Sequence, residues 1–379
     1  MLPAVGKIVH GQAKKVLKCK IEPLAHEVRK VVSKIRAAQS ERISAPRVTL
    51  NQHCNMCQFQ DDCYQLADES NDLSLLRGLS AKEIEKQRIR GVTTVTQFAY
   101  TYRPGRRGKR KTGGARKHDI ALQAVAIRDK KVYVVDSPTM LSSPIALYLD
   151  IEGIPDQGYD YLIGLITVVE GVTTTHSFWA DNRKDEIAIW NACSQIISKF
   201  EAYTLYHYGQ YELRFLDRMR KLVGEIEAAA IDRIRARSCN VLATIYSHIY
   251  FPTRSNGLKK IAPFLGMSWT DINASGIQSL AWRLAWELSG DESLKQHLIR
   301  YNMDDCIALR RVTEFVRSVC DDGVGKKNGT EPEVASATED LAVAGSHFGK
   351  IKFFCPELDY INKCAYSVSV RGNHSCQGR

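Results

Sequence analysis

The chain has 379 residues, of which 44% are hydrophobic and 25% charged, and its formal net charge is +11. These values are typical of a globular protein with roughly two or three domains, and they exclude a disordered or fibrous chain. The sequence has neither an apolar run of about eighteen residues nor a signal-peptide core, so we expect a soluble, cytoplasmic protein without a membrane-spanning helix.

Residues 1–67 are predicted to form a small helical region that contains cysteines. Val28–Ala38 has the pattern of a helix, and three closely spaced cysteines follow it: Cys54, Cys57 and Cys63. In a chain without a secretory signal, this spacing favours a metal or cluster site over disulfides. Three ligands are fewer than a closed tetrahedral site requires, and neither His53 nor Cys19 is a convincing further ligand.

Residues 68–118 are predicted to form a helix-hairpin-helix-like module that ends in a basic loop. Turns at Gly78 and Gly91 separate short helical segments. Such a module can hold a phosphate with backbone N–H groups at a helix N-terminus. An ordinary helical connector explains the pattern equally well.

The basic loop carries most of the net charge of the chain. Between residues 103 and 118 it has no acid and eight basic residues: Arg103, Arg106, Arg107, Lys109, Arg110, Lys111, Arg116 and Lys117. Without these eight charges the net charge falls from +11 to +3. The loop is therefore predicted to bind a nucleic-acid backbone without sequence specificity and in a salt-sensitive way.

The segment Pro144–Pro155 is an apolar run that predicts a buried strand. Side chains alternate along a strand, so Asp150 and Glu152 project from the same side at its end. Two carboxylates there are difficult to keep ionised together without a cation, and oxygen ligands suit Mg²⁺ or Mn²⁺ rather than zinc. Two carboxylates on a solvated strand end are the alternative.

The elements predicted around this strand follow one order along residues 119–320. They are a preceding hairpin (Leu122–Ile127 and Lys131–Val135), two further strands (Tyr161–Val169 and Thr173–Trp179), a helix (Asp185–Glu201), a strand (Thr204–Tyr208), a helix containing Phe215 and Met219, and a long helix (Asp291–Val319). Hydrophobic periodicity supports each assignment.

Further acids occur on the predicted helices. Glu212 opens the helix after the fourth core strand, and Tyr301 and Asp305 are four apart on the long helix and share a face. Asp304 lies roughly 100° around the helix from Asp305. The first-turn position of Glu212 also suits the helix dipole, so a purely structural role is the alternative there.

In this order, the motifs Asp-x-Glu, an acid at a strand-to-helix junction and Tyr-x-x-x-Asp resemble the DEDD exonucleases of the tyrosine subclass. More narrowly, Leu141–Val319 resembles the YprB-type ribonuclease-H-like domain of RecB-like nucleases, and Asn256–Ala262 is also similar to that family. The resemblance implies an α/β fold, in which a ribonuclease-H-like core with a mixed sheet flanked by helices follows the small cysteine-containing region.

The same resemblance implies a nuclease that acts 3′→5′ on single-stranded ends of DNA or RNA. Asp150, Glu152, Glu212 and Asp305 would hold two Mg²⁺ or Mn²⁺ ions about 3.5–4 Å apart, and Tyr301 would orient the attacking water. Glu212 departs from the class, which places Asp there. A nucleic-acid-binding accessory module that no longer cuts is therefore the alternative, and a truncated chain without independent function is a third hypothesis.

The resemblance to RecB-like nucleases also gives an interpretation of the cysteines. In those with an iron–sulfur staple, three cysteines follow the catalytic core and a fourth lies upstream. The acids before Cys54 include no acidic-x-Lys pair, so the RecB-like part is predicted to be truncated and its iron–sulfur cluster incomplete. Residues 321–345 are predicted to be a linker and 346–379 a C-terminal tail, and the sequence identifies no helicase or repair partner.

Overall fold

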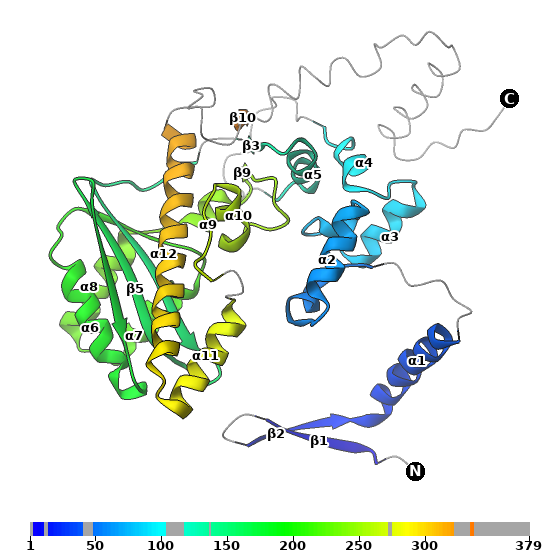
Figure 1. Cartoon of the computed structure of the whole chain (residues 1–379), viewed down its shortest axis with the longest axis horizontal. Coiled ribbons are helices and arrows are strands. Elements are labelled where there is room, and N and C mark those ends of the chain that lie inside the picture. The colour runs from blue at the N-terminus through cyan, green and yellow to red at the C-terminus, as the bar shows by residue number, and fades with distance from the viewer. Residues whose placement is uncertain are drawn as a thin grey trace, which may run out of the picture. The chain divides into compact units, whose positions relative to one another are not determined.

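The computed structural model describes residues 3–10, 14–40, 48–103, 117–135, 138–271, 275–321 and 334–336. The chain divides into two compact units, Met1–Glu69 and Ser70–Arg379 (Figure 1). The predicted tail, residues 346–379, lies outside the described residues, as does most of the predicted linker. Within the described ranges, no helix combines the length and apolar composition needed to cross a bilayer.

The first unit has a hairpin followed by helices. Its elements are β1 (Val5–His10), β2 (Lys15–Lys20), α1 (Ile21–Gln39), the 3₁₀ turn η1 (Gln52–Met56) and α2 (Gln60–Glu69). The helix predicted over Val28–Ala38 lies within α1, and none of the α1 side chains is buried. The antiparallel β1–β2 hairpin, which pairs Val5 with Lys20, adds strands to a region expected to be helical.

The second unit begins with short helices connected by glycine turns. They are η2 (Leu73–Leu75), α3 (Ala81–Ile89) and α4 (Val95–Ala99). Gly78 and Gly91 have φ angles of 95° and 82°, which favour glycine because a Cβ disfavours this region. Ser80 caps α3 by accepting from the Glu83 N–H, and the Glu83 carboxylate accepts in return from the Ser80 N–H.

The hairpin predicted over Leu122–Ile127 and Lys131–Val135 is wrong in its first half. Leu122–Ile127 belongs to helix α5 (Ile120–Asp129), because the Asp119 carboxylate accepts hydrogen bonds from the first N–H groups and caps the helix. The following strand forms a small separate sheet in the order β10 (Val334–Ser336), β3 (Val132–Val134), β9 (Ile249–Tyr250). Strand β10 therefore falls within the segment that was predicted to be a linker.

The central sheet has five strands in the order β6-β5-β4-β7-β8. Their bounds are β4 (Ile145–Ile154), β5 (Tyr159–Val169), β6 (Val172–Trp179), β7 (Tyr203–His207) and β8 (Ser238–Asn240). Strands β4, β5 and β6 form the predicted antiparallel meander, and β7 and β8 continue parallel to β4. The turn at Glu170 and Gly171 joins β5 to β6 with positive φ at both residues.

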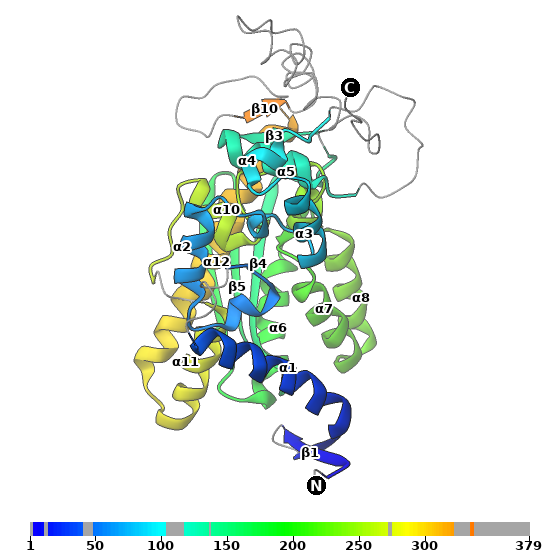
Figure 2. The same ribbon diagram turned by 90° about the vertical axis from the view of Figure 1, so that its right-hand side faces the viewer.

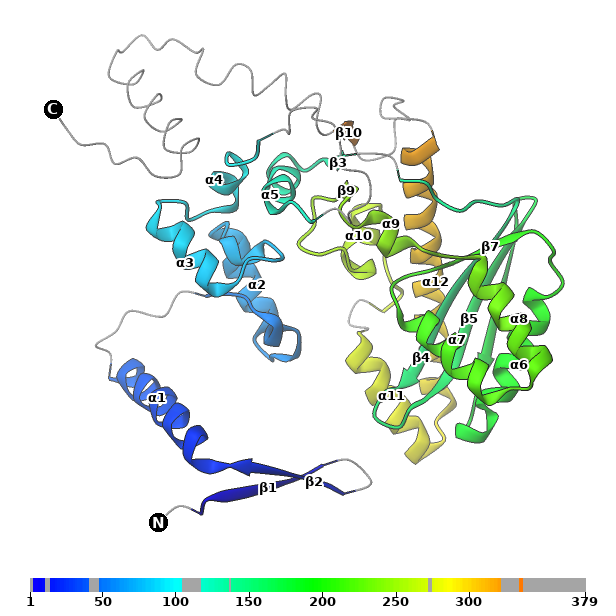
Figure 3. The ribbon, with the colours of Figure 1, turned by 180° about the vertical axis from the view of Figure 1, so that it is seen from behind.

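Helices cover both faces of this sheet (Figure 2). They are η3 (Arg183–Asp185), α6 (Glu186–Ile197), α7 (Tyr211–Leu222), α8 (Glu225–Ala236), α9 (Val241–Ile245), α10 (Leu258–Phe264), α11 (Gly276–Ser289) and α12 (Glu292–Asp321). Figure 3 shows α6, α7 and α8 on one side of the strands and the long helix α12 on the other. The predicted fold class, a mixed sheet flanked by helices, is confirmed.

The alternation along β4 determines which side chains face which helices. Leu147, Leu149 and Ile151 belong to the core cluster with α6, α7 and α8, whereas Ala146 and Tyr148 pack into the cluster with α10 and α12. Even-numbered residues of β4 therefore face α12. Continuing this alternation places the next two even residues, Asp150 and Glu152, under α12.

Candidate metal centre

Asp150 and Glu152 lie at the carboxyl end of β4, on the face covered by α12. The pairing of β4 with β5 shifts register between Glu152 and Gly153. A side chain at Gly153 would overlap the Asp160 carboxylate and the Tyr211 hydroxyl, so only glycine fits at this irregularity. The bulge ends the regular alternation directly after the two acids.

A second glycine lets α12 approach these acids closely. Gly164 of β5 pairs with Asp150 across the sheet, and a Cβ there would overlap the side-chain amide of Asn302. With that space free, the Asn302 amide donates to Asp150 Oδ2 at 2.6 Å. The long helix is thereby held against the end of β4.

Helix α12 brings Tyr301 and Asp305 to the same place. They are one helical turn apart and share a helix face, and the charge of Asp305 contributes to the raised pKa of Tyr301. Trp269 Nε1 also donates to Asp305 Oδ1 at 2.7 Å. Asp304 has a different partner, because its carboxylate accepts from the backbone N–H of Thr270 at 2.8 Å.

The carboxylates of Asp150, Glu152 and Asp305 converge. Each offers an oxygen, and these oxygens all lie within 4.8 Å of one another. In the part of the chain that the structure describes, this is the only such group of three His, Cys, Asp or Glu ligands. Residues 155 positions apart in the sequence therefore form one cluster of oxygen donors.

Burial and mutual repulsion make full ionisation of this cluster unfavourable. Burial, followed by the charge of Asp305, raises the pKa of Asp150 well above its ordinary value. The same two causes raise the pKa of Glu152 to about 8. Burial raises the pKa of Asp305 to about 6, although Lys259 and the hydrogen bond from Trp269 oppose that shift. A cation between the oxygens would remove the repulsion.

Neutral donors orient the carboxylates but do not neutralise them. Besides the bonds from Asn302 and Trp269, the Ser279 hydroxyl donates to Glu152 Oε2 at 3.1 Å. Sequence analysis did not identify these three residues. Of the three, only Asn302 was predictable from the sequence, because it lies three residues before Asp305 and so shares its helix face.

Lys259 adds a positive charge beside the cluster. It is the second residue of α10, and its ammonium lies 4.1 Å from the centre of the Tyr301 ring and 5.7 Å from that of Trp269. Burial lowers its pKa, while the charges of Asp305, Glu152 and Asp150 oppose that shift. From the sequence, this residue was noted only as part of Asn256–Ala262, the segment that is similar to the YprB-type family.

Glu212 lies near the cluster but outside it. This buried residue in the first turn of α7 contributes to the raised pKa of Asp150. Its Oε2 is 3.6 Å from Nδ1 of the buried His207, and neither atom has a hydrogen-bond partner. Asn302 Oδ1 is likewise buried without a partner.

The donor set fits a hard divalent cation. Carboxylate oxygens are the ligands that Mg²⁺ and Mn²⁺ prefer, and unpartnered polar atoms of Glu212 and Asn302 lie beside the cluster. Asp150, Glu152 and Asp305 would hold such an ion. Glu212, whose charge acts on Asp150, would be a ligand for a second one.

Of the predicted cysteine ligands in the first unit, Cys54 lies on η1, Cys57 directly follows η1 and Cys63 lies on α2. Cys54 and Cys63 are partly buried and Cys57 is exposed, and all three are free thiols. The backbone N–H of Asn51 donates to Cys54 Sγ at 3.2 Å. The iron–sulfur site stays a prediction.

Most of the basic loop lies outside the described residues. Arg106, Arg107, Lys109, Arg110, Lys111 and Arg116 belong to that part. Arg103 is described, and its guanidinium donates to the carbonyls of Tyr100 and Tyr102 at 2.8 and 2.9 Å. Lys117 is exposed. Nucleic-acid binding by this loop stays a prediction.

Comparison with known families gives a match to part of the chain. A family model described as the RNase_H superfamily matches residues 147–317, from β4 into α12, and this range includes all three clustered acids. Searches of curated proteins and of solved structures found no match. The match supports a nuclease-type domain with an acidic group that could bind metal. It does not test the YprB-type assignment or the RecB-like interpretation of the N-terminal region.

Proposed function

We propose that this protein is a metal-dependent nuclease that removes nucleotides 3′→5′ from single-stranded ends of DNA or RNA. The observation that carries this proposal is the convergence of Asp150, Glu152 and Asp305 within 4.8 Å, on a domain matched by the RNase_H superfamily model. Such a donor set suits the ions that serve phosphodiester hydrolysis. The 3′→5′ direction rests on the resemblance to the tyrosine subclass of DEDD exonucleases.

The clustered acids have one role in this proposal, which is to hold the cations. When bound, two divalent ions would polarise the phosphodiester, increase the acidity of the attacking water and stabilise the leaving oxygen. The hydrogen bonds from Asn302, Ser279 and Trp269 keep the carboxylates in one orientation. That fixed orientation reduces the rearrangement that the site needs during the reaction.

Tyr301 acts as a neutral phenol. Burial, together with the nearby carboxylates, raises its pKa above the ordinary value, so its hydroxyl stays protonated and cannot serve as a base. A phenol in this state can orient a water molecule through a hydrogen bond. The Lys259 ammonium, 4.1 Å from the centre of the Tyr301 ring, packs against this side chain.

Lys259 provides the positive charge that a phosphate needs beside acidic groups. Its ammonium is partly buried against Tyr301, and it experiences the charges of all three acids. A negatively charged strand approaching these carboxylates would otherwise be repelled. We assign Lys259 to contact with a phosphate of the bound strand.

The alternative is an accessory module that binds nucleic acid without cutting it. Glu212 favours this alternative, because it stands where the resembled class has Asp and it lies outside the group of three. In that case the domain would bind strands but have no hydrolytic activity.

One experiment separates the two functions. Oligonucleotides labelled at the 3′ or the 5′ end are incubated with Mn²⁺ and wild-type protein or Asp150→Asn. The nuclease would release the 3′ label first as a mononucleotide and shorten the 5′-labelled strand stepwise, and Asp150→Asn would bind the strand without cutting it. Binding by the wild type with no degradation of DNA or RNA by any divalent metal would establish the accessory module instead.

A further inference from the structure

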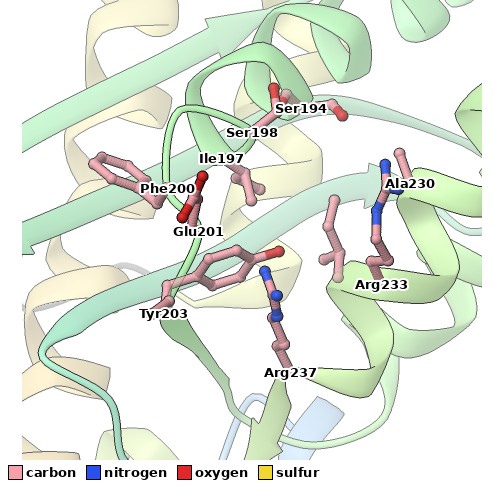
Figure 4. Close-up of a pocket in the computed structure, with 11 residues that line it drawn as sticks. Ser194, Ile197, Ser198, Phe200, Glu201, Tyr203, Ala230, Arg233 and Arg237 are labelled. Atoms are coloured by element: carbon pink, nitrogen blue, oxygen red, sulfur yellow. The ribbon is translucent and has the colours of Figure 1, made fainter.

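A pocket of about 590 Å³ lies at the other end of the central sheet from the acidic cluster. It is formed by α6, β7, α8 and the segment between α6 and β7 (Figure 4). Strand β7 runs parallel to β4 with Tyr203 level with Ile145. Asp150 is five residues further along β4, about 17 Å at the usual rise per residue. The pocket is therefore separate from the acidic cluster.

Two arginines make one wall of this pocket positive. Arg233 and Arg237 are four residues apart at the end of α8, so they point to the same side of the helix. Both are exposed, and neither forms an ion pair within the described part of the chain. By contrast, Arg235, between them, pairs with Asp217. The one acid that lines the pocket is Glu201, which leaves its lining with a net positive charge.

Tyr203 holds one of these guanidinium groups in place. The Arg237 guanidinium carbon lies 5.1 Å from the centre of the Tyr203 ring, a distance at which a cation and an aromatic ring attract one another. In Figure 4 the tip of Arg237 reaches the Tyr203 ring, while Arg233 rises from α8 nearby. A guanidinium has about five N–H donors, so Arg237 retains several for a ligand.

The remaining walls can accept a larger group than a phosphate alone. Phe200 and Ile197 give an apolar and aromatic surface, and Ser194 adds a hydroxyl. The pocket volume falls within the range of about 300–1,000 Å³ that is usual for small-molecule sites. Paired guanidiniums prefer phosphate, and an aromatic ring can stack on a base.

We propose that this pocket binds a nucleoside monophosphate, with its phosphate at Arg233 and Arg237 and its base against Phe200. The site is independent of the proposed nuclease reaction, because it uses none of the residues assigned to that reaction. A ligand here would contact α6, β7 and α8 and leave the acidic cluster open.

The test is titration of the full chain with adenosine monophosphate in metal-free buffer containing a chelator, followed by calorimetry. We expect saturable binding that weakens at least tenfold in Arg233→Ala/Arg237→Ala. Arg235→Ala, on the same helix, is the matched control and should bind as the wild type does, as should Asp150→Asn. Thermal melts would check that each variant is folded.

Phe200→Leu gives a second, independent measurement. This variant should lose the preference for the mononucleotide over inorganic phosphate while it still binds phosphate. The proposal would be overturned by an absence of saturable mononucleotide binding, by unchanged binding in the double arginine variant, or by equal wild-type affinity for inorganic phosphate and the mononucleotide. Binding of a 5′-phosphorylated oligonucleotide alone would also overturn it.

Discussion

Asp160 and Glu186 share the guanidinium of Arg218, whereas Asp150, Glu152 and Asp305 face one another and receive hydrogen bonds from neutral donors. Arg218 Nη1 donates to Glu186 at 2.8 Å, and the other terminal nitrogen also contacts Asp160. Both acids of this pair are almost fully buried. The acidic pair thus hydrogen-bonds a guanidinium of the fold, whereas Asp150, Glu152 and Asp305 receive hydrogen bonds from Asn302, Ser279 and Trp269.

This difference indicates that the pair bound by Arg218 stabilises the fold, whereas the group of three has a functional role. Burial raises the pKa of Asp160, but Tyr211 and Arg218 oppose that shift. For Asp150 and Glu152, burial and the charge of Asp305 both raise the pKa, and these effects outweigh the hydrogen bonds from Asn302 and Ser279. A buried group of carboxylates that repel one another is unfavourable unless a cation is bound there, and groups with such raised pKa values occur most often at functional sites.

The largest expected effect is on catalysis, from removing one acid of the group of three. Asp305→Asn should slow Mn²⁺-dependent strand degradation at least about 1,000-fold, equivalent to about 4 kcal/mol of transition-state stabilisation. The reason is that α12 would no longer supply its carboxylate to the cations. Degradation rates of an end-labelled oligonucleotide measure this effect.

The neighbouring acid provides the control for that variant. Asp304→Asn changes a carboxylate that bonds Thr270 and lies outside the group of three, so it should retain most of the activity. If both variants lost activity equally, the distinction between the two adjacent acids would fail.

Arg218→Ala should have the largest effect on stability. It leaves Asp160 and Glu186 buried without their cation, and the Arg218 side chain is itself 30% exposed. We therefore expect a loss of about 3 kcal/mol in the free energy of unfolding, at the lower end of the range for breaking a buried pair. Urea denaturation of the metal-free protein measures it.

Arg220→Ala is the matched control on the same helix. Its pair with Asp232 is about half exposed, so the loss should be much smaller than in Arg218→Ala, because solvent screens an exposed ion pair. A similar loss in both variants would contradict the structural role assigned to Arg218.

The sequence alone predicted those features of the acidic cluster that depend on local residue spacing. Alternation along Pro144–Pro155 placed Asp150 and Glu152 on one face, and helical spacing placed Tyr301 with Asp305. Such patterns need no knowledge of distant contacts. They identified all three acids that converge.

Contacts that depend on the tertiary fold were not predictable in the same way. Trp269 and Ser279 reach the acids from separate segments of the chain, and the network around Arg218 joins β5, α6 and α7. The mistaken strand at Leu122–Ile127 has a local cause, because a short apolar run has no periodicity that distinguishes a strand from a helix. The sequence feature that indicates a helix here is Asp119, a residue type that is favoured at the N-cap.

The affinity of the acidic cluster for Mn²⁺ should rise with pH. The pKa of Glu152 is raised from 4.5 to about 8, so the metal-free folded state holds a proton that the unfolded state releases. The contribution of this group to stability therefore falls as pH rises from about 4.5 to 8. Metal binding must expel the same proton, which makes affinity increase by up to about tenfold per pH unit over this range.

Calorimetric titrations with Mn²⁺ at pH 6, 7 and 8 measure this increase. Repeating them in buffers of different ionisation enthalpy gives the number of protons released. Glu152→Gln should bind more weakly and release fewer protons. An affinity independent of pH would show that the carboxylates are already ionised in the metal-free protein.

Lys259→Met should have the smallest of these effects, because it changes substrate contact and leaves the metal ligands intact. Loss of its positive charge should weaken single-strand binding about tenfold, or about 1.4 kcal/mol, measured by fluorescence anisotropy in an Asp150→Asn background. Mn²⁺ affinity should be unchanged or higher, since a like charge is removed. Lys259→Arg should restore strand binding, and the exposed neighbour change Lys260→Met should alter it little. Weaker Mn²⁺ binding in Lys259→Met would instead indicate that this lysine supports the carboxylates, and its assignment to the strand phosphate would be wrong.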